Sequence, residues 1–361
     1  MYQHYIKKQT ITIDGGTYTP DIFRSKGIPA FALKSDFHYK LYLFLQEWFS
    51  RSPFVKVLTS GSTGAPKEMM MEKERMMNSA ELTCSFLGLK EGDKALLCMS
   101  LDFIAGKMMV VRALVAGLDL YIVPVSGHPL KDTKETFDFT AMIPMQVYNS
   151  LQSEEERSKL EKIKNLLIGG GAIDAQLEKT LNPFPNNVYS SYGMTETLSH
   201  IALRKLNGED ASESYMPFSS VKLSLSGDNA LIIDAPLVAG ERLYTNDIAK
   251  INEDGSFRII GRKDNVINSG GIKIQAETLE ELLKPFIKGQ FAITSLPDQK
   301  FGEIVVLVAE ENVNELLFKD VHPTYYQPKK IIKIDKIPLT ETGKISRADL
   351  KKLVSSSLIH S

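Results

Sequence analysis

Residues 59–67 of the chain read Thr59-Ser60-Gly61-Ser62-Thr63-Gly64-Ala65-Pro66-Lys67. This stretch follows a strand that we predict at Val55–Leu58 and precedes a long helix that we predict over Glu68–Leu87. Glycine lets a backbone approach a ligand closely, backbone amides can point inward, and lysine supplies positive charge. We therefore predict a loop that wraps an oxyanion such as a phosphate. It is not a Walker A loop, because the G-x-x-x-x-G-K-[ST] pattern fails at Pro66, and the simpler alternative is a Ser- and Gly-rich surface turn.

Around this loop and as far as Ser219, short β-rich runs alternate with helical patterns. This alternation is typical of a layered α/β domain with a mainly parallel sheet. Besides the two elements above, we predict strands at Ala95–Met99, Tyr121–Val125 and Asn165–Ile168, and helices at Met108–Val115 and Gln146–Leu151.

The character of the chain changes after Ser219. Short strands around turns predict a small β-rich subdomain, followed beyond Gly261 by a compact α+β pattern. We place a domain boundary at Arg262–Asp264, so that residues 1–262 form a large N-terminal domain and residues 264–361 a small C-terminal one. The predicted strands are Val221–Ser226, Ala230–Ile233, Ile248–Ile251, Phe257–Ile260, Lys273–Ile274, Phe291–Ser295 and Glu303–Ala309, and the predicted helices are Ala276–Leu283 and Arg347–Val354.

The composition excludes several classes of protein. With 43 Lys+Arg against 44 Asp+Glu, the formal net charge is −1, and no run of basic residues offers a face for nucleic acid. The 2 cysteines, Cys84 and Cys98, are too few for a disulfide framework or a cysteine-rich metal site. The N-terminus has no apolar signal region, and no window approaches the ~18 apolar residues of a membrane span. We expect a cytoplasmic protein with free thiols and neither a nucleic-acid partner nor a membrane span.

Four further motifs follow the loop along the chain. They are Ser191-Tyr192-Gly193-Met194-Thr195-Glu196-Thr197, Tyr244-Thr245-Asn246-Asp247, Gly261-Arg262-Lys263-Asp264 with Ser269-Gly270-Gly271, and Pro338-Leu339-Thr340-Glu341-Thr342-Gly343-Lys344. Taken in this order, the five motifs resemble those of the adenylate-forming (AMP-binding) superfamily, which includes acyl- and aryl-CoA ligases, peptide-synthetase adenylation domains and luciferases. The resemblance covers residues 55–352, and Asn246 departs from it, because the family usually has glycine there.

The resemblance implies that the protein binds ATP, Mg²⁺ and CoA. It assigns the ATP phosphates to Thr59, Ser60, Gly61, Ser62, Thr63, Gly64 and Lys67. An aromatic face and side-chain-free backbone suit a flat base, which points to Tyr192, Gly193, Gly169, Gly170 and Gly171. Asp247 can accept from the ribose hydroxyls, Arg262 can donate to ribose or phosphate, and Glu196 is a hard oxygen ligand suited to Mg²⁺. The simpler alternatives are a core aromatic, a strand-ending turn, and surface charges that are solvated or paired in salt bridges.

The resemblance also implies a moving C-terminal domain. Lys344 reaches the carboxylate and the α-phosphate as the acyl-adenylate forms, beside Thr195 and Glu196, because positive charge is most useful where negative charge develops. Asp264 is the expected hinge between two half-reactions. Rotation about it would withdraw Lys344 and bring Ser269, Gly270 and Gly271 beside the CoA channel.

Three stretches resemble the o-succinylbenzoate–CoA ligases of menaquinone biosynthesis. Ile143-Pro144-Met145-Gln146 is similar to their V-P-T-Q segment, and Gly193–His200 is similar to their G-M-T-E-T-x-S-Q segment. Ser100–Gly106 aligns loosely with P-L-F-H-I-S-G, with Phe103 in place of the histidine. That acid is a dianion, so its pocket needs a cation or hydrogen-bond donors. The candidates are Lys107, which is our first choice, with Ser199, His200 and Arg112.

Two other functions stay open at this point. Leu101-Asp102 is similar to a segment whose Asp binds the α-ammonium of an amino acid in adenylation domains, and a catalytically dead binding module could share the fold. The presence of Lys67, Glu196, Asp247, Arg262 and Lys344 disfavours the dead module. Only 58 residues precede the phosphate loop, far fewer than in the family. We therefore expect an N-terminal region shortened relative to the family, with the face it leaves covered by a second subunit in a homodimer.

Overall fold

The computed structural model describes residues 2–25, 27–58, 68–318, 321–340 and 345–357. The described residues divide into two compact units. The first takes in the chain up to residue 222 together with residues 234–243, and the second takes in residues 223–233 and the chain from residue 244 onward. The domain boundary expected at residues 262–264 and the expected homodimer stay predictions.

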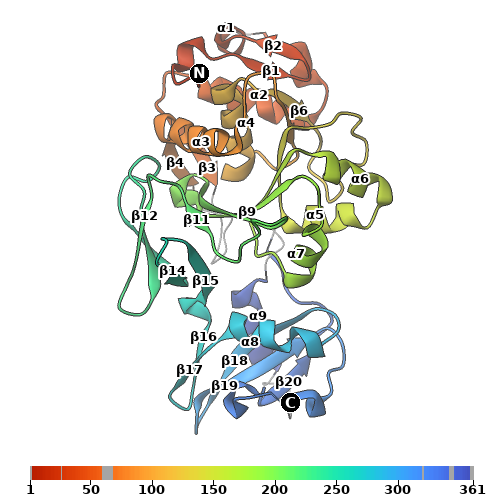
Figure 1. Ribbon diagram of the computed structural model, residues 1–361, viewed down its shortest axis with the longest axis vertical. Helices are drawn as coiled ribbons and strands as arrows, with labels where there is room; N and C mark the ends of the chain where they lie inside the picture. Colours follow the sequence, from red (N-terminus) through yellow and green to blue (C-terminus); the bar gives the residue numbers. More distant parts are fainter. Residues whose placement is uncertain (1, 26, 59–67, 319–320, 341–344, 358–361) are drawn as a thin grey trace. The chain divides into compact units, whose positions relative to one another are not determined.

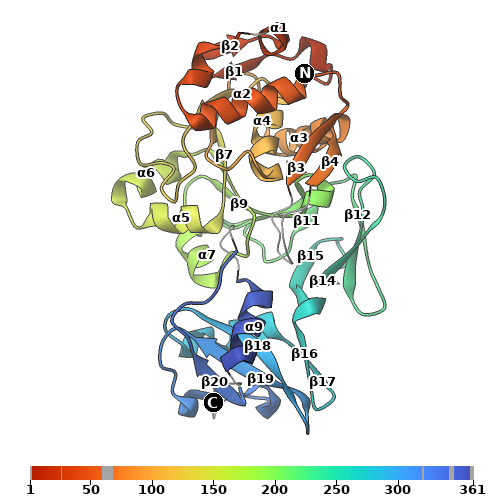
Figure 2. The same cartoon turned by 180° about the vertical axis from the view of Figure 1, so that it is seen from behind.

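A nine-stranded sheet lies at the centre of the first unit, counted over the described residues, with the order β11-β10-β9-β8-β7-β5-β6-β1-β2 (Figures 1 and 2). From β9 to β1 in this order the strands run parallel, which confirms the mainly parallel α/β sheet, whereas β2, β10 and β11 run antiparallel to their neighbours. The strands are β1 (Ile11–Ile13), β2 (Gly16–Tyr18), β5 (Lys94–Leu97), β6 (Asp119–Ile122), β7 (Phe139–Met142), β8 (Asn165–Ile168), β9 (Asn187–Gly193), β10 (His200–Lys205) and β11 (Met216–Pro217).

Helices bury the sheet because alternate strand residues point to each face. On one face, strand residues of β5, β7, β8 and β9 form a core with α5 (Pro144–Leu151), α6 (Glu154–Lys162) and α7 (Ala175–Leu181). Elsewhere α4 (Ile104–Ala116) contacts β1, β5 and β6 and packs on α3 (Lys73–Leu87). Both α3 and α4 end at a left-handed glycine, at Gly88 and Gly117, the usual helix C-terminus. The other helices of the first unit are α1 (Pro20–Arg24) and α2 (Asp36–Trp48), with 3-10 turns at Ile6–Lys8, Ala30–Leu33 and Thr195–Thr197.

The expectation of one helix over Glu68–Leu87 is wrong in its first five residues. Glu68–Glu72 forms strand β4, which pairs antiparallel with β3 (Phe54–Leu58), and helix α3 begins only at Lys73. Methionine and glutamate favour helices in isolation, but here the backbone of Glu68–Glu72 bonds to β3. Long-range pairing therefore overrides the local preference, and the predicted phosphate loop connects two strands of a hairpin.

The second unit contains the two small sheets expected from the sequence after Ser219. One has the order β12-β13-β14-β15, and the other has β17-β16-β19-β18 with β20 beside β19. Residues of α8 and α9 close separate cores on the two faces of the β18–β19 pair. The elements are β12 (Lys222–Leu225), β13 (Ala230–Asp234), β14 (Leu243–Ile251), β15 (Phe257–Arg262), β16 (Val266–Ser269), β17 (Ile272–Gln275), β18 (Phe291–Asp298), β19 (Gly302–Ala309), β20 (Lys330–Lys333), α8 (Ala276–Leu283) and α9 (Arg347–Ser357), with 3-10 turns at Lys263–Asn265, Lys284–Phe286, Glu315–Phe318 and Thr324–Tyr326.

Within the described ranges, none of the helices combines the length and the apolar composition that crossing a membrane would require.

Candidate active site

Several predicted site residues meet at the carboxyl edge of the parallel strands. From β5 the chain passes through α4 to β6 on one side, whereas β7 lies on the other side of β5, so the connections diverge at this point. Open parallel sheets bind ligands at the carboxyl ends of strands beside such a divergence. Gly169–Gly171 follows β8 and Met194–Glu196 follows β9, its parallel neighbour. The structure thus brings these two predicted segments to one edge.

The three glycines after β8 leave bare backbone at this edge. A Cβ atom on Gly169 would overlap the hydroxyl of Ser191, which donates to the Ile168 carbonyl at 3.2 Å. Gly170 adopts φ +78°, which side chains rarely tolerate, and a Cβ on Gly171 would touch Pro144. A side chain is therefore disfavoured at Gly169 by Ser191 and at Gly170 by its positive φ, and the exposed backbone at Gly170 suits a flat ligand.

Gln146 ties three segments of the edge together. Its Nε2 donates to the carbonyl oxygens of Cys98 after β5 (3.0 Å) and of Ser126 (2.9 Å) before β7. Its Oε1 accepts from the backbone N–H of Ile143 at 3.2 Å, at the start of α5. The sequence pointed to Gln146 only as part of a motif. In the structure its buried side chain holds the segments after β5, before β7 and at the start of α5 together.

The turn from β9 to β10 carries Thr195 and the exposed Glu196. A Cβ on Gly193 would overlap the carbonyl oxygen of Ser199, so the two strands can meet here only with glycine. Thr197 closes the turn, because its hydroxyl accepts from the Met194 N–H at 3.0 Å and donates to the Ser199 carbonyl at 2.7 Å. The ring of Tyr192, on β9 before the turn, lies 5.9 Å from the ring of Tyr215.

Ser199 and His200 lie in a buried polar chain that starts at Arg112 of α4. The Nη2 of Arg112 donates to Ser199 Oγ at 2.7 Å, and Ser199 Oγ lies 3.2 Å from Nδ1 of His200. The Nε2 of His200 lies 2.9 Å from Thr83 Oγ1, which itself donates to the Ser79 carbonyl at 3.1 Å. The four hydrogen bonds are mutually consistent when His200 is neutral and carries its proton on Nε2. Each group then donates to the next one, from Arg112 through Ser199, His200 and Thr83 to the Ser79 carbonyl.

Electrostatics agree with a neutral histidine beside a charged guanidinium. Burial, and then the charge of Arg112, hold the pKa of His200 well below its usual range. Burial lowers the pKa of Arg112 to about 10, which still leaves it protonated at neutral pH. Only 2% of Arg112 is exposed, no carboxylate of the described residues pairs with it, and its Nε has no hydrogen-bond partner. A buried cation without a counter-charge is costly, so the burial of Arg112 calls for a functional explanation.

The structure does not bring Lys107 together with Ser199 and His200. Its ammonium donates to the backbone carbonyl of Lys56 on β3 and lies 5.5 Å from the centre of the Phe44 ring. The charge that does meet Ser199 is Arg112, five residues further along α4. The signal for it was the single arginine within the apolar run Met108–Ala116.

In the second unit the predicted ribose and hinge residues form one ion-paired group. Asp247 and Arg262 face each other on β14 and β15, with Arg262 Nη1 at 3.1 Å from Asp247 Oδ1. Arg262 Nη2 also lies 2.8 Å from Asp264 Oδ2, which accepts from Asn246 Nδ2 at 3.2 Å. Asn246, which replaces the family's glycine, thus contacts the expected hinge.

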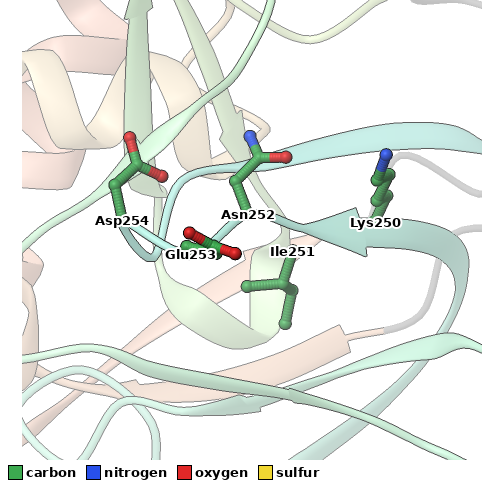
Figure 3. A pocket seen from close by; sticks show the side chains of 5 residues that line it. All are labelled: Lys250, Ile251, Asn252, Glu253 and Asp254. Atoms are coloured by element: carbon green, nitrogen blue, oxygen red, sulfur yellow. The ribbon is translucent and has the colours of Figure 1, made fainter.

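The second unit also contains the predicted glycine loop and a surface hollow. Gly270 and Gly271, between β16 and β17, adopt φ +60° and +83°, so the predicted glycine loop is a tight turn. The hollow in Figure 3 lies at the β14–β15 hairpin and is lined by Lys250–Asp254. Asp254 closes that turn by accepting from the N–H and hydroxyl of Ser256, and none of the predicted site residues lines the hollow.

Some predicted residues lie outside the described part of the chain. In that part no three His, Cys, Asp or Glu side chains form a metal cluster. The predictions outside the described residues are Thr59, Ser60, Gly61, Ser62, Thr63, Gly64, Lys67 and Lys344.

A family model described as AMP-binding enzyme matches residues 46–241, which is more than half of the chain. The chain belongs to this family. A solved acyl-CoA synthetase (AMP-forming)/AMP-acid ligase II-like protein from Dyadobacter fermentans is 30% identical with a TM-score of 0.64, covering 93% of this chain and 98% of that one. The 2-succinylbenzoate–CoA ligase of Listeria monocytogenes is 25% identical over 87% of this chain and 73% of its own length. A variant of E. coli MenE with bound OSB-AMS is also 25% identical, with a TM-score of 0.66, covering 83% of this chain and 68% of that one. These comparisons confirm the superfamily expected from the five motifs.

Proposed function

We propose that this AMP-forming acid–CoA ligase activates o-succinylbenzoate, an aromatic dicarboxylic acid of menaquinone biosynthesis. In the first half-reaction the acid carboxylate attacks the α-phosphate of MgATP, giving acyl-AMP and pyrophosphate. In the second, the thiolate of CoA displaces AMP and gives the thioester. The similarity to 2-succinylbenzoate–CoA ligases supports this choice of acid.

The observation that carries the proposal is the buried Arg112. An acid with one carboxylate needs a cation only at the reacting end, where ATP is bound. A dicarboxylate also brings an unreactive second carboxylate, whose burial without a partner would cost several kcal/mol. The guanidinium of Arg112 is buried, charged and without a carboxylate partner among the described residues, so it answers that need. Ser199 and His200 would orient it through the chain that ends at Thr83.

The nucleotide roles follow from the same proposal. Tyr192 and Gly169–Gly171 would hold the adenine, and Asp247 would accept hydrogen bonds from the ribose hydroxyls. Arg262 is preorganised for a ribose or phosphate contact by its pairs with Asp247 and Asp264. Thr195 and Glu196 would face the phosphates, with Glu196 as the ligand of Mg²⁺.

Amino-acid activation is disfavoured by the surroundings of Asp102. In that alternative its carboxylate would bind an α-ammonium. Here Lys40 Nζ lies 2.9 Å from Asp102 Oδ2, and the Ser100 hydroxyl donates to the same oxygen at 3.0 Å. The carboxylate is thus already paired within the protein.

Replacing Arg112 with methionine tests the choice of acid. We expect kcat/KM for o-succinylbenzoate to fall by about tenfold to a hundredfold more than kcat/KM for benzoate, because a charged hydrogen bond is worth about 1.5–3 kcal/mol. Initial rates of AMP release with CoA would measure both acids. Arg204→Met is a matched control, because Arg204 is mostly buried but already paired with Glu178 at 2.7 Å. Equal losses on both acids would make Arg112 structural, and robust activity with an amino acid alone would overturn the proposal.

Replacing Glu196 with glutamine tests the magnesium assignment. The amide removes the negative charge that holds a hard cation, so we expect half-maximal activity to require several times more Mg²⁺. Titrating Mg²⁺ at saturating ATP measures this directly. Glu209→Gln changes another exposed carboxylate of the same unit and serves as the control. An unchanged Mg²⁺ requirement would move the ligand role to another acid or to water.

A further inference from the structure

Strand β3 has one edge that no strand covers among the described residues. Among the named strands it pairs only with β4, in a two-stranded sheet. The backbone of Lys56, in the middle of β3, bonds to two side chains from other elements. Its N–H donates to Glu47 Oε1 of α2 at 2.7 Å, and its carbonyl oxygen accepts from the ammonium of Lys107 on α4. A carboxylate and an ammonium thus take the place of a neighbouring strand.

The same hairpin is held at both of its ends. Where β3 ends, the Leu58 N–H donates to the Asp102 carbonyl at 3.4 Å, and Leu58 forms a parallel bridge with Phe103. Where β4 ends, the Lys73 N–H donates to the Pro53 carbonyl at 2.9 Å, and its ammonium donates to the Glu47 carbonyl at 2.9 Å. The bonds at Lys56 therefore lie between two backbone anchors and complete the attachment of β3.

Lys107 is an unusual side chain to use for this purpose. Only 9% of it is exposed, and burial lowers the pKa of its ammonium. Burying a cation is costly unless it gains strong hydrogen bonds. The adjacent Gly106 lets α4 approach the loop after β5, because a Cβ there would overlap the carbonyl of Ser100. Close packing of α4 on this loop therefore sets the place from which Lys107 reaches β3.

We propose that Lys107 and Glu47 form a clamp on β3 that positions the predicted phosphate loop. The loop, residues 59–67, begins directly after Leu58 and ends directly before Glu68, which pairs with Leu58 in the hairpin. Fixing β3 fixes Leu58 and, through the hairpin pairing, Glu68, the two residues between which the loop is attached. A site whose attachment is set before the ligand arrives costs less to bind to. Lys107 is then a positioning residue for ATP. This inference rests on ATP use, which is part of the proposed function, and is independent of the choice of acid.

The test replaces Lys107 with methionine, which keeps most of the apolar stem over Phe44 and removes the donors. We expect the Kd of MgATP, measured by calorimetry, to rise about tenfold. The lost hydrogen bond, worth about 1.5–3 kcal/mol, sets the upper limit on how far the binding-competent position of β3 can lose population. The KM of the acid should stay within about twofold. Lys107→Arg should recover part of the affinity, because it restores a charged donor. Glu47→Ala, which removes the other half of the clamp, should weaken MgATP in the same direction and serves if Lys107→Met does not fold.

Lys159→Met is the matched control. Its ammonium also donates to two backbone carbonyls, of Leu130 and Lys131, but in the segment before β7, so MgATP affinity should be unchanged. A folded Lys107→Met that binds MgATP as wild type does would overturn the clamp. Unchanged MgATP affinity with selective loss of the dicarboxylate would instead return Lys107 to the acid pocket. Wild-type protein that binds no MgATP would contradict the proposed function itself, which is a separate result.

Discussion

Lys344→Ala should reduce acyl-adenylate formation by about 10²–10³-fold while leaving thioester formation from pre-made acyl-AMP near the wild-type rate. Removing one preorganised charge from the place where negative charge develops typically costs this factor. Lys344 itself lies outside the described residues. The residues on either side are described: Leu339 bridges to Ile345, and the Ser346 N–H donates to the Pro338 carbonyl at 2.8 Å.

The two half-reactions can be measured separately. ATP–pyrophosphate exchange without CoA reports the first, and release of AMP from acyl-AMP on addition of CoA reports the second. Lys336→Ala removes an exposed lysine a few residues earlier and should change neither rate. A similar loss in both half-reactions would contradict a role confined to adenylation, and no loss in either would remove Lys344 from the mechanism.

Asp264→Pro should keep ATP–pyrophosphate exchange and lose CoA acylation by at least about a hundredfold, close to the limit of detection. A hinge works because a few residues absorb a large change in φ and ψ. Proline fixes φ near −65° and restricts the residue before it, here Lys263. Asp264 lies in the 3-10 turn Lys263–Asn265, between the end of β15 and the start of β16. A single rigid torsion there would hold one conformation of the catalytic cycle.

The carboxylate of Asp264 needs its own control, because it bonds to Arg262 and Asn246. Asp264→Ala removes these bonds but leaves the backbone free to rotate. We expect Asp264→Ala to acylate CoA far better than Asp264→Pro does. If the two variants lose CoA acylation equally, the ion pair matters and not the torsion, and if Asp264→Pro keeps both activities, the hinge lies elsewhere.

The sequence alone predicted an element correctly where the residues that determine it are neighbours along the chain. The predicted helix Ala276–Leu283 and strand Asn165–Ile168 are present with the same bounds. The helix has one apolar face, and the strand is a short, largely apolar run that is buried on both faces. The glycines after β8 also follow this rule, since Ser191 crowds a side chain at Gly169 and the positive φ of Gly170 disfavours one there. Glu68–Glu72 did not follow it, because its pairing partner is β3, ten and more residues earlier in the chain.

By itself the sequence determined the family, the mainly parallel α/β sheet and the order of the nucleotide motifs, since these depend on residues that are neighbours along the chain. Only the tertiary structure decided which of two cations on α4 meets Ser199. Lys107 and Arg112 are five residues apart, so they point to different sides of a helix with 3.6 residues per turn. The ammonium of Lys107 bonds to β3, and the guanidinium of Arg112 bonds to Ser199, the residue before β10. The physical reason is that burial and partners belong to the packed helix, and no local pattern of residues contains them.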